Sequence, residues 1–181
     1  DPDFGSGGVV WTDLAGSTDK AAALVTLADG TAFVGGSTFN GADYDFVLLK
    51  YRADGTLNPR FGTGGVAITD FGHDDACNAL ALQRDGKPVL VGYSDDGAEA
   101  VVAVARFESG GAPDSGFGTA GLATAAAGNG LSGSGVVIRP DERIAVGGAV
   151  LNPATGWDFG LVLFEVDGTV GIEVAVEPPG A

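Results

Sequence analysis

Residues 78–107 read NALALQRDGKPVLVGYSDDGAEAVVAVARF, a segment with three short runs rich in Val, Leu and Ala. Arg84-Asp85-Gly86-Lys87 separates the first two runs, and an Asp-Gly pair accepts the positive φ angles of a tight hairpin turn. The polar loop Ser94-Asp95-Asp96-Gly97 separates the second run from the third. With Val66-Ala67-Ile68-Thr69 as a preceding first strand, the segment predicts a four-stranded antiparallel meander.

The same pattern recurs along the chain with a period of about 56 residues, and such a period indicates a repeat architecture. Three kinds of marker keep the period in one phase. They are the Phe-Gly pairs Phe4-Gly5, Phe61-Gly62 and Phe117-Gly118, the turn residues Asp29, Asp85 and Asp141, and the glycines Gly36, Gly92 and Gly148.

These repeats predict an all-β fold of three tandem four-stranded antiparallel blades, arranged like part of a propeller. The second and third strands of each unit are apolar at nearly every position, which is typical of strands buried on both faces by neighbouring sheets. We place the blades at residues 1–57, 58–113 and 114–170, followed by a terminal strand and a Pro/Gly tail at 171–181.

The repeat resembles a known family, the delta-60 repeat, a bacterial repeat of the β-propeller type. The resemblance is carried by NPRFGTGGV at 58–66, ALALQRDGK at 79–87, YDF at 44–46 and KYRADGTL at 50–57. It implies a propeller or propeller-like stack in exported or surface proteins, with no common enzymatic activity. The third copy departs from the pattern after Val170, where the Asp-x-x-Phe-Gly segment is missing.

Three blades are too few for a closed propeller, which has about four to eight. The chain is then a fragment of a longer array, half of a six-bladed ring, or a unit that stacks head to tail. The first-strand type also occurs four times, one more than three blades need. We expect one terminal segment to pair with the sheet edge of a neighbouring copy, and the competing interpretation is that it caps its own chain. The residues concerned are Val9, Val10 and Trp11 at one end and Ile172, Val174 and Val176 at the other.

Composition narrows the possible partners. The net charge of −15 and the absence of long apolar stretches argue against nucleic acid and against membrane insertion. Acidity, 32 glycines and a single cysteine fit a secreted or cell-surface bacterial protein, with the signal peptide absent from this chain. A salt-adapted cytosolic protein is the alternative. One cysteine, Cys77, and one histidine, His73, cannot assemble a zinc cluster, and we interpret Cys77 as a small buried apolar residue.

No pattern in the chain predicts an active site or a resident cofactor. His73 lies in a polar turn, and most aspartates occupy hairpins, where Asp caps its own turn. The loops around Tyr44 and Asp45, Asp74 and Asp75, and Asp95 and Asp96 offer oxygen ligands that would suit calcium, although none has a calcium-loop spacing, so solvated turns are the competing interpretation. Trp157 and Asp158 match Tyr44 and Asp45 across the repeat, with one residue inserted between the copies, and mark a possible ligand loop.

Two hypotheses on function follow. The first is a non-enzymatic extracellular or cell-surface structural protein that self-associates through its open ends by terminal strand addition, into filaments where the rotation between copies does not close. The alternative is a propeller module whose loops bind a glycan or another surface protein.

Overall fold

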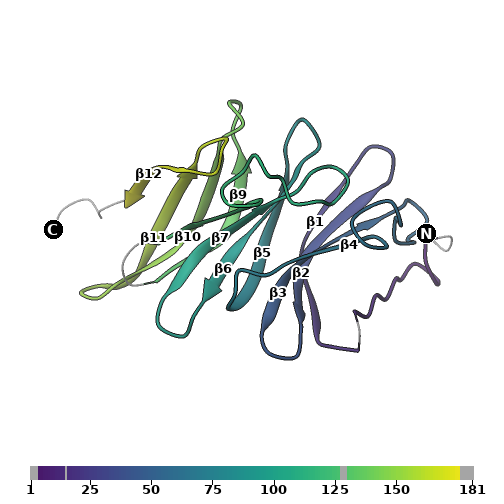
Figure 1. Ribbon diagram of the computed structural model, residues 1–181, viewed down its shortest axis with the longest axis horizontal. Coiled ribbons are helices and arrows are strands. Elements are labelled where there is room, and N and C mark those ends of the chain that lie inside the picture. Colours follow the sequence, from purple (N-terminus) through teal and green to yellow (C-terminus); the bar gives the residue numbers. More distant parts are fainter. Residues whose placement is uncertain (1–3, 15, 127–129, 176–181) are drawn as a thin grey trace.

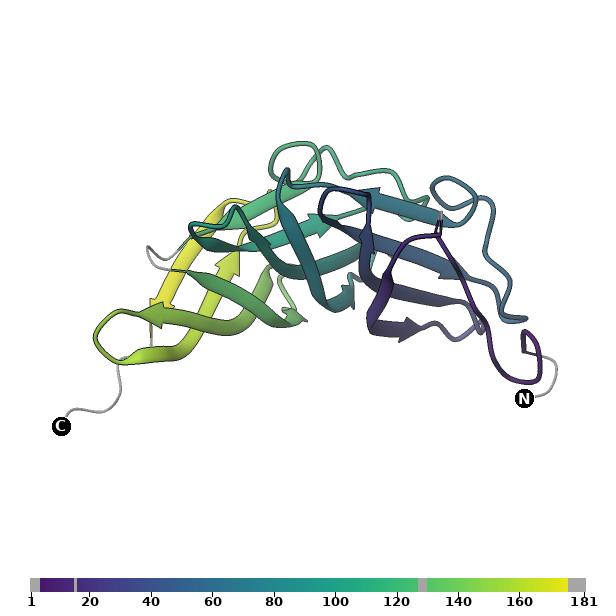
Figure 2. The same cartoon turned by 90° about the horizontal axis from the view of Figure 1, so that it is seen from below.

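The fold consists of three four-stranded antiparallel sheets in the part of the chain that the computed structural model describes, residues 4–14, 16–126 and 130–175. The sheets follow one another along the long axis of the molecule (Figure 1) and form a shallow arc (Figure 2). The three sheets do not close into a ring within the described residues. Every element there is a β-strand, so the predicted all-β fold with three four-stranded blades is confirmed. Across the described ranges, no helix has the length and apolar character needed to cross a membrane.

Each sheet takes its four strands in chain order. Sheet 1 contains β1 (Asp19–Thr26), β2 (Ala32–Phe39), β3 (Tyr44–Tyr51) and β4 (Val66–Thr69). Sheet 2 contains β5 (Asp74–Leu82), β6 (Pro88–Asp95), β7 (Ala100–Arg106) and β8 (Leu122–Ala125). Sheet 3 contains β9 (Leu131–Ile138), β10 (Ile144–Asn152), β11 (Gly156–Phe164) and β12 (Val170–Ala175).

The sheets are offset from the sequence repeat by one strand. Val66–Thr69, predicted to begin the middle blade, instead pairs with β3 and ends sheet 1, with Ile68 opposite Val47. In the same way β8 ends sheet 2 and β12 ends sheet 3. The prediction that Val66–Thr69 is the first strand of the middle meander is thus wrong, because a repeat period does not tell which sheet a strand joins. Each repeat begins with the strand that completes the preceding sheet.

A backbone hydrogen bond recurs in all three repeats and holds each Phe-Gly turn in place. In each case the glycine N–H donates to a carbonyl in the turn that follows the last strand of the same repeat, which is the third strand of its sheet. The pairs are Gly5 to Asp54 at 3.0 Å, Gly62 to Gly110 at 2.8 Å and Gly118 to Asp167 at 2.7 Å. The three copies therefore have the same local structure, although the N-terminal copy has no preceding sheet among the described residues.

The core lies between the sheets in two layers. The layer between sheets 1 and 2 contains Phe33, Phe46, Leu48, Phe61, Leu90, Ala103, Ala105 and Phe107. The layer between sheets 2 and 3 contains Val89, Val91, Val102, Val104, Phe117, Ile144, Val146, Val162 and Phe164. Alternate residues of β6 and β7 enter opposite layers, so sheet 2 is buried on both faces, as its apolar strands predict.

Arg106 of β7 forms a buried ion pair and also links sheet 2 to the turn that precedes β12. Arg106 Nε donates to Asp114 Oδ2 at 2.7 Å, and Arg106 Nη1 donates to the Val166 carbonyl at 2.8 Å. Lys87 Nζ also donates to Asp114, at 2.9 Å. Burial alone would raise the pKa of Asp114, but hydrogen bonds from Lys87 and Gly116 and the charge of Arg106 lower it well below its usual range.

The glycine that follows each central apolar run sits where two strands approach closely at a β-bulge. The register of β5 against β6 shifts between Cys77 and Ala79, beside Gly92. A Cβ on Gly92 would lie 1.8 Å from the Ala76 carbonyl oxygen, and Gly36 and Gly148 meet backbone oxygens in the same way. Only glycine fits these positions without moving the backbone, which explains this repeat marker physically.

We predict that Gly92→Ala lowers the free energy of unfolding by about 1–3 kcal/mol, because the added methyl group collides with main-chain atoms that cannot rotate away. The control is Gly147→Ala, where no described atom lies within 4 Å of the added Cβ. That substitution should stay within about 0.5 kcal/mol of the parent. Urea denaturation of both variants tests this, and equal stabilities would contradict the steric explanation.

Candidate functional site

The face of sheet 3 that is turned away from sheet 2 is apolar, and no other described part of the chain covers it. We call it the C-terminal face, and its exposed members are Val137, Trp157, Phe159 and Leu161. Phe159 is 88% exposed and Trp157 is 62% exposed. They border a hollow of about 760 Å³ that also involves Gly135 and Gly147. A contiguous apolar surface of this kind is typical of an interaction site.

The repeat shows what this face would contact in a longer array. In sheet 1, Val47 pairs with Gly36, and Phe46 directly precedes Val47. In sheet 3, Gly160 pairs with Gly148, and Phe159 directly precedes Gly160. Because Gly36 and Gly148 are the same marker of the repeat, Phe46 and Phe159 occupy equivalent places. Phe46 is fully buried between sheets 1 and 2, and its equivalent in sheet 2, Val102, is 1% exposed between sheets 2 and 3. Phe159 is therefore exposed at a position that is covered by the next sheet in both other copies.

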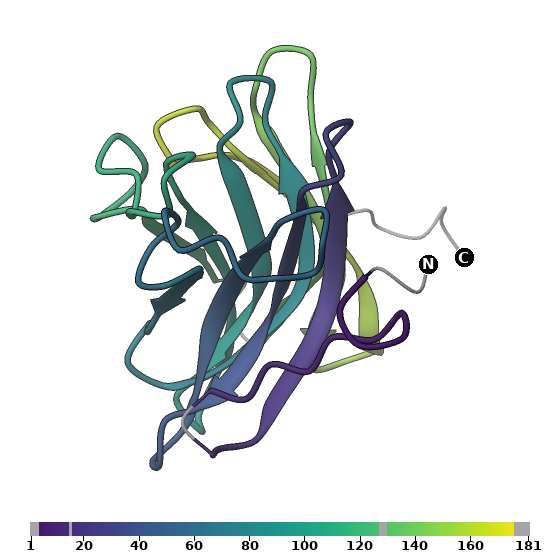
Figure 3. The same ribbon diagram turned by 90° about the vertical axis from the view of Figure 1, so that its right-hand side faces the viewer.

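The opposite end of the row is the face of sheet 1 turned away from sheet 2, which we call the N-terminal face. Residues 4–14 cross this face, and Figure 3 shows them passing in front of β1. A cavity of about 550 Å³ remains between this segment and the sheet, lined by apolar side chains that include Val10, Leu24, Val34 and Leu49. The segment thus covers the face without filling the space in front of it.

The predicted strand at Val9, Val10 and Trp11 joins no sheet in the described residues. Val9 forms an isolated bridge with Ser6, and the Thr12 hydroxyl lies 2.6 Å from the Tyr51 hydroxyl. Trp11 is 90% exposed. The other predicted terminal strand belongs to its own chain, since Ile172 and Val174 lie in β12 and pair with β11. Val176 lies outside the described residues.

Most predicted ligand-loop residues bind their own loop or pack against neighbours. Asp95 Oδ1 accepts the Gly97 N–H at 2.8 Å, and Asp96 Oδ1 accepts the N–H groups of Ala98 and Glu99 at 2.8 and 3.0 Å. The Glu99 and Ala98 hydrogen bonds lower the pKa of Asp96. These two aspartates therefore cap a turn, as the hairpin pattern predicts.

Tyr44, Trp157 and Asp158 differ although their places in the repeat match. The Tyr44 ring packs against Phe39, and Lys20 Nζ lies 4.2 Å from its centroid. Asp158 accepts the Thr155 hydroxyl at 2.8 Å in an exposed turn, and Trp157 borders the C-terminal face. Tyr44 is thus a packing residue, whereas Trp157 is available for contact.

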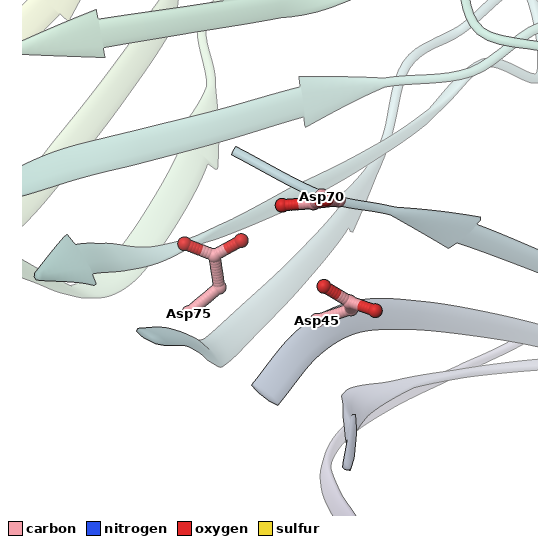
Figure 4. Close-up of side chains that lie close together, drawn as sticks. All are labelled: Asp45, Asp70 and Asp75. Carbon is pink, nitrogen blue, oxygen red and sulfur yellow. The ribbon is translucent and has the colours of Figure 1, made fainter. Parts of the chain in front are cut away.

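Asp45 lies in a cluster of three carboxylates where sheets 1 and 2 meet. One oxygen from each of Asp45, Asp70 and Asp75 lies within 4.8 Å of the others (Figure 4). Asp45 comes from β3, Asp75 from β5, and Asp70 follows β4. The interpretation of Asp75 as part of a solvated turn is wrong, because it lies in a strand and is fully buried. Sequence reasoning did not single out Asp70, since only the pairing of β4 with β3 brings it beside Asp45.

Burial controls the ionisation of this cluster. Burial raises the pKa of Asp75 to about 6, although the hydrogen bond from the Phe71 N–H acts in the opposite direction. Burial also raises the pKa of Asp45, and the charges of Asp70 and Asp43 add to that effect. Two desolvated carboxylates that repel each other are therefore held together, and Oδ1 of each accepts no hydrogen bond from the described residues.

The carboxylate cluster includes neither Cys77 nor His73. Cys77 is buried, as predicted, and burial raises the pKa of its thiol to about 12, which keeps it protonated and unreactive near neutral pH. His73 lies in an exposed bend between β4 and β5.

We predict that Asp75→Asn stabilises the protein at pH 8 in the presence of a chelator, by up to about 3 kcal/mol. The folded-state pKa of Asp75, about 6, is above that of an unfolded chain, so deprotonation between about pH 4 and 6 costs stability. The gain should disappear as the pH falls to 4. Urea denaturation across this pH range tests the prediction. Asp96→Asn is the control, because the pKa of Asp96 is lowered and its substitution should not stabilise at pH 8.

Comparison with known proteins agrees with this architecture. Residues 27–61 and 83–117 match the sequence model of a family described as a domain of unknown function (DUF5122) beta-propeller. Each match runs from the hairpin that follows the first strand of a sheet to the next Phe-Gly turn. No curated protein matches the chain. The narrower resemblance to the delta-60 repeat stays a prediction, and what the match supports is that these units are repeats of the β-propeller type.

Proposed function

We propose that this chain is a non-enzymatic structural module that self-associates head to tail, with the C-terminal face of one copy against the N-terminal face of the next. The observation that carries the proposal is the exposure of Phe159, 88%, at a place where Phe46 and Val102 are buried. Covering a side chain such as Phe contributes roughly 1.5–3 kcal/mol. The uncovered faces therefore provide a driving force for association.

The two faces differ in a way that favours a head-to-tail contact. The C-terminal face corresponds to the faces by which sheets 1 and 2 pack against the sheet that follows them. The N-terminal face, with Leu24, Val34 and Leu49, corresponds to the faces by which sheets 2 and 3 pack against the sheet that precedes them. Sheet 3 of one copy against sheet 1 of another would repeat the contacts already present between sheets 1 and 2. Such a heterologous contact gives rings if the rotation closes and filaments if it does not.

Addition of a terminal strand completes this contact. Residues 9–12 are equivalent to β4 and β8, each of which completes the sheet before its own repeat. In a neighbouring copy the corresponding place is the edge of β11, which β12 occupies in the single chain. We therefore propose that residues 9–12 of each copy replace β12 of the preceding copy at the edge of β11, so that main-chain hydrogen bonds add to the apolar contact.

The acidic composition supports a location outside the cell or on a bacterial cell surface, and we include that location in the proposal. A net charge of −15 opposes the approach of two copies, and salt screens this repulsion. Association would therefore be weak in dilute buffer and stronger as the ionic strength rises.

A second candidate function rests on the hollow beside Trp157. Trp157 and Phe159 border an open space next to Gly147 and Gly148, and exposed aromatic rings of this kind can stack on a sugar or hold a protein side chain. This alternative predicts a monomer that binds immobilised glycans, with binding lost in Trp157→Ala. Glycan-array binding by a chain that stays monomeric at high concentration would favour it over self-association.

We predict that Phe159→Asp weakens self-association at least about tenfold, because a carboxylate would be buried without a partner in the contact. The control is Val166→Asp, which changes a side chain that is 48% exposed in a turn outside both faces. Sedimentation velocity over a concentration series measures the effect, and circular dichroism verifies the fold. Equal association of both variants and the parent would remove the proposed contact.

We also predict that deletion of residues 1–12 abolishes assembly while the circular dichroism signal of the sheets remains. The deleted segment adds no strand to a sheet of its own chain in the described residues, so the backbone hydrogen bonds between the strands do not depend on it. Removal of β12 and the following residues serves as the comparison, because it frees the edge of β11 and should leave assembly possible. A chain without residues 1–12 that still assembles would contradict strand addition.

A further inference from the structure

We propose that Asp45, Asp70 and Asp75 bind one divalent cation, Ca²⁺, which links sheet 1 to sheet 2. This inference is independent of self-association, because all three residues belong to a junction inside a single chain. The cation would be held by carboxylate oxygens from β3, from the segment after β4 and from β5 (Figure 4).

The spacing of the carboxylates suits calcium. The three oxygens lie within 4.8 Å of one another, and oxygens that share a Ca²⁺ ion at 2.3–2.6 Å can be up to about 5 Å apart. Mg²⁺ requires shorter bonds of about 2.0–2.1 Å and keeps several waters. A site with two buried carboxylates leaves less room for such waters, so the larger and more adaptable ion fits better.

Two buried oxygen atoms in the cluster have no partner. Asp45 is 6% exposed and Asp75 is fully buried, yet Oδ1 of each accepts no hydrogen bond within the described part of the chain. Their Oδ2 atoms are occupied, by Asn40 Nδ2 at 3.0 Å and by the Phe71 N–H at 2.8 Å. Ser94, directly opposite Asp75 in the β5–β6 ladder, also has an unpartnered buried hydroxyl. Such unpaired buried groups are costly, and a cation would satisfy them.

The equivalent aspartate of the first repeat shows what a purely structural role looks like. Asp19 Oδ2 accepts the Leu14 N–H at 2.8 Å, as Asp75 Oδ2 accepts the Phe71 N–H. Asp19 Oδ1, however, accepts the Thr38 hydroxyl at 2.6 Å. The same fold position can therefore satisfy both carboxylate oxygens internally, whereas Oδ1 of Asp75 accepts no hydrogen bond from the described residues.

The second junction shows that the packing of the sheets does not require acidic residues. At the places that correspond to Asp45, Asp70, Asp75 and Ser94, the junction of sheets 2 and 3 has Val101, Ala126, Leu131 and Val150. An apolar set thus closes one junction, whereas three carboxylates and a hydroxyl meet at the other. A stack of like sheets explains the first arrangement but not the second, which a bound cation explains.

Calorimetric titration of chelator-treated protein with CaCl₂ tests the inference, together with the thermal unfolding midpoint with and without Ca²⁺. We expect one ion per chain and a midpoint that rises with Ca²⁺ concentration, because the ion binds the folded state. Both measurements are made on the monomer at low concentration, so their outcome does not depend on assembly. No binding heat together with an unchanged midpoint would overturn the proposal.

Variants identify the ligands. Asp75→Asn and Asp45→Asn should each weaken Ca²⁺ binding at least about tenfold, and Asp75→Asn is expected to remain folded because it removes a buried charge. The matched control is Asp19→Asn, which changes the equivalent aspartate of the first repeat and should keep the affinity of the parent. Parental affinity in Asp75→Asn and Asp45→Asn would place any bound calcium elsewhere and would also overturn the proposal.

Discussion

The exchange of one strand between consecutive repeats is the constraint on which the rest of the structure depends. Because Val66–Thr69 leaves its own repeat to complete sheet 1, and Leu122–Ala125 does the same for sheet 2, each junction is crossed by a strand as well as by side chains. The Phe-Gly turn that precedes each of these strands stays bound to its own repeat by the recurrent glycine N–H bond. Neighbouring sheets are therefore held in a single relative position, and their apolar faces meet in a defined order.

This order makes the two ends of the row different. At one end the chain presents Phe159 and Leu161 at positions that are buried in the other copies, and at the other end residues 4–14 lie across a face above a cavity. An array of like sheets has no internal means of covering both ends unless it closes, since each sheet has two apolar faces and only one neighbour there. The terminal surfaces are thus a direct consequence of the repeat.

The two internal junctions solve the same packing problem with different chemistry. Between sheets 2 and 3, Arg106 and Asp114 form a buried ion pair, while the opposite rim of the junction is apolar at Val101 and Leu131. Between sheets 1 and 2, that rim instead contains Asp45 and Asp75 with unpartnered oxygens. Repulsion between these carboxylates weakens the junction unless protons or a cation neutralise them, so this is the place where solution conditions act most directly on the stack.

The amino-acid sequence by itself determined the period, the all-β class, the hairpin turns and the burial of both faces of the middle sheet. These properties follow from local rules: Asp-Gly pairs form tight turns, and short runs of apolar residues form buried strands. The sequence also indicated that a first-strand segment was present in excess. Only the tertiary structure decided that the first strand of each repeat belongs to the preceding sheet, since hydrogen bonds between strands depend on spatial neighbours rather than on period. The same pairing brought Asp70 beside Asp45 and buried Asp75, because residues far apart in the chain come together only where two sheets meet.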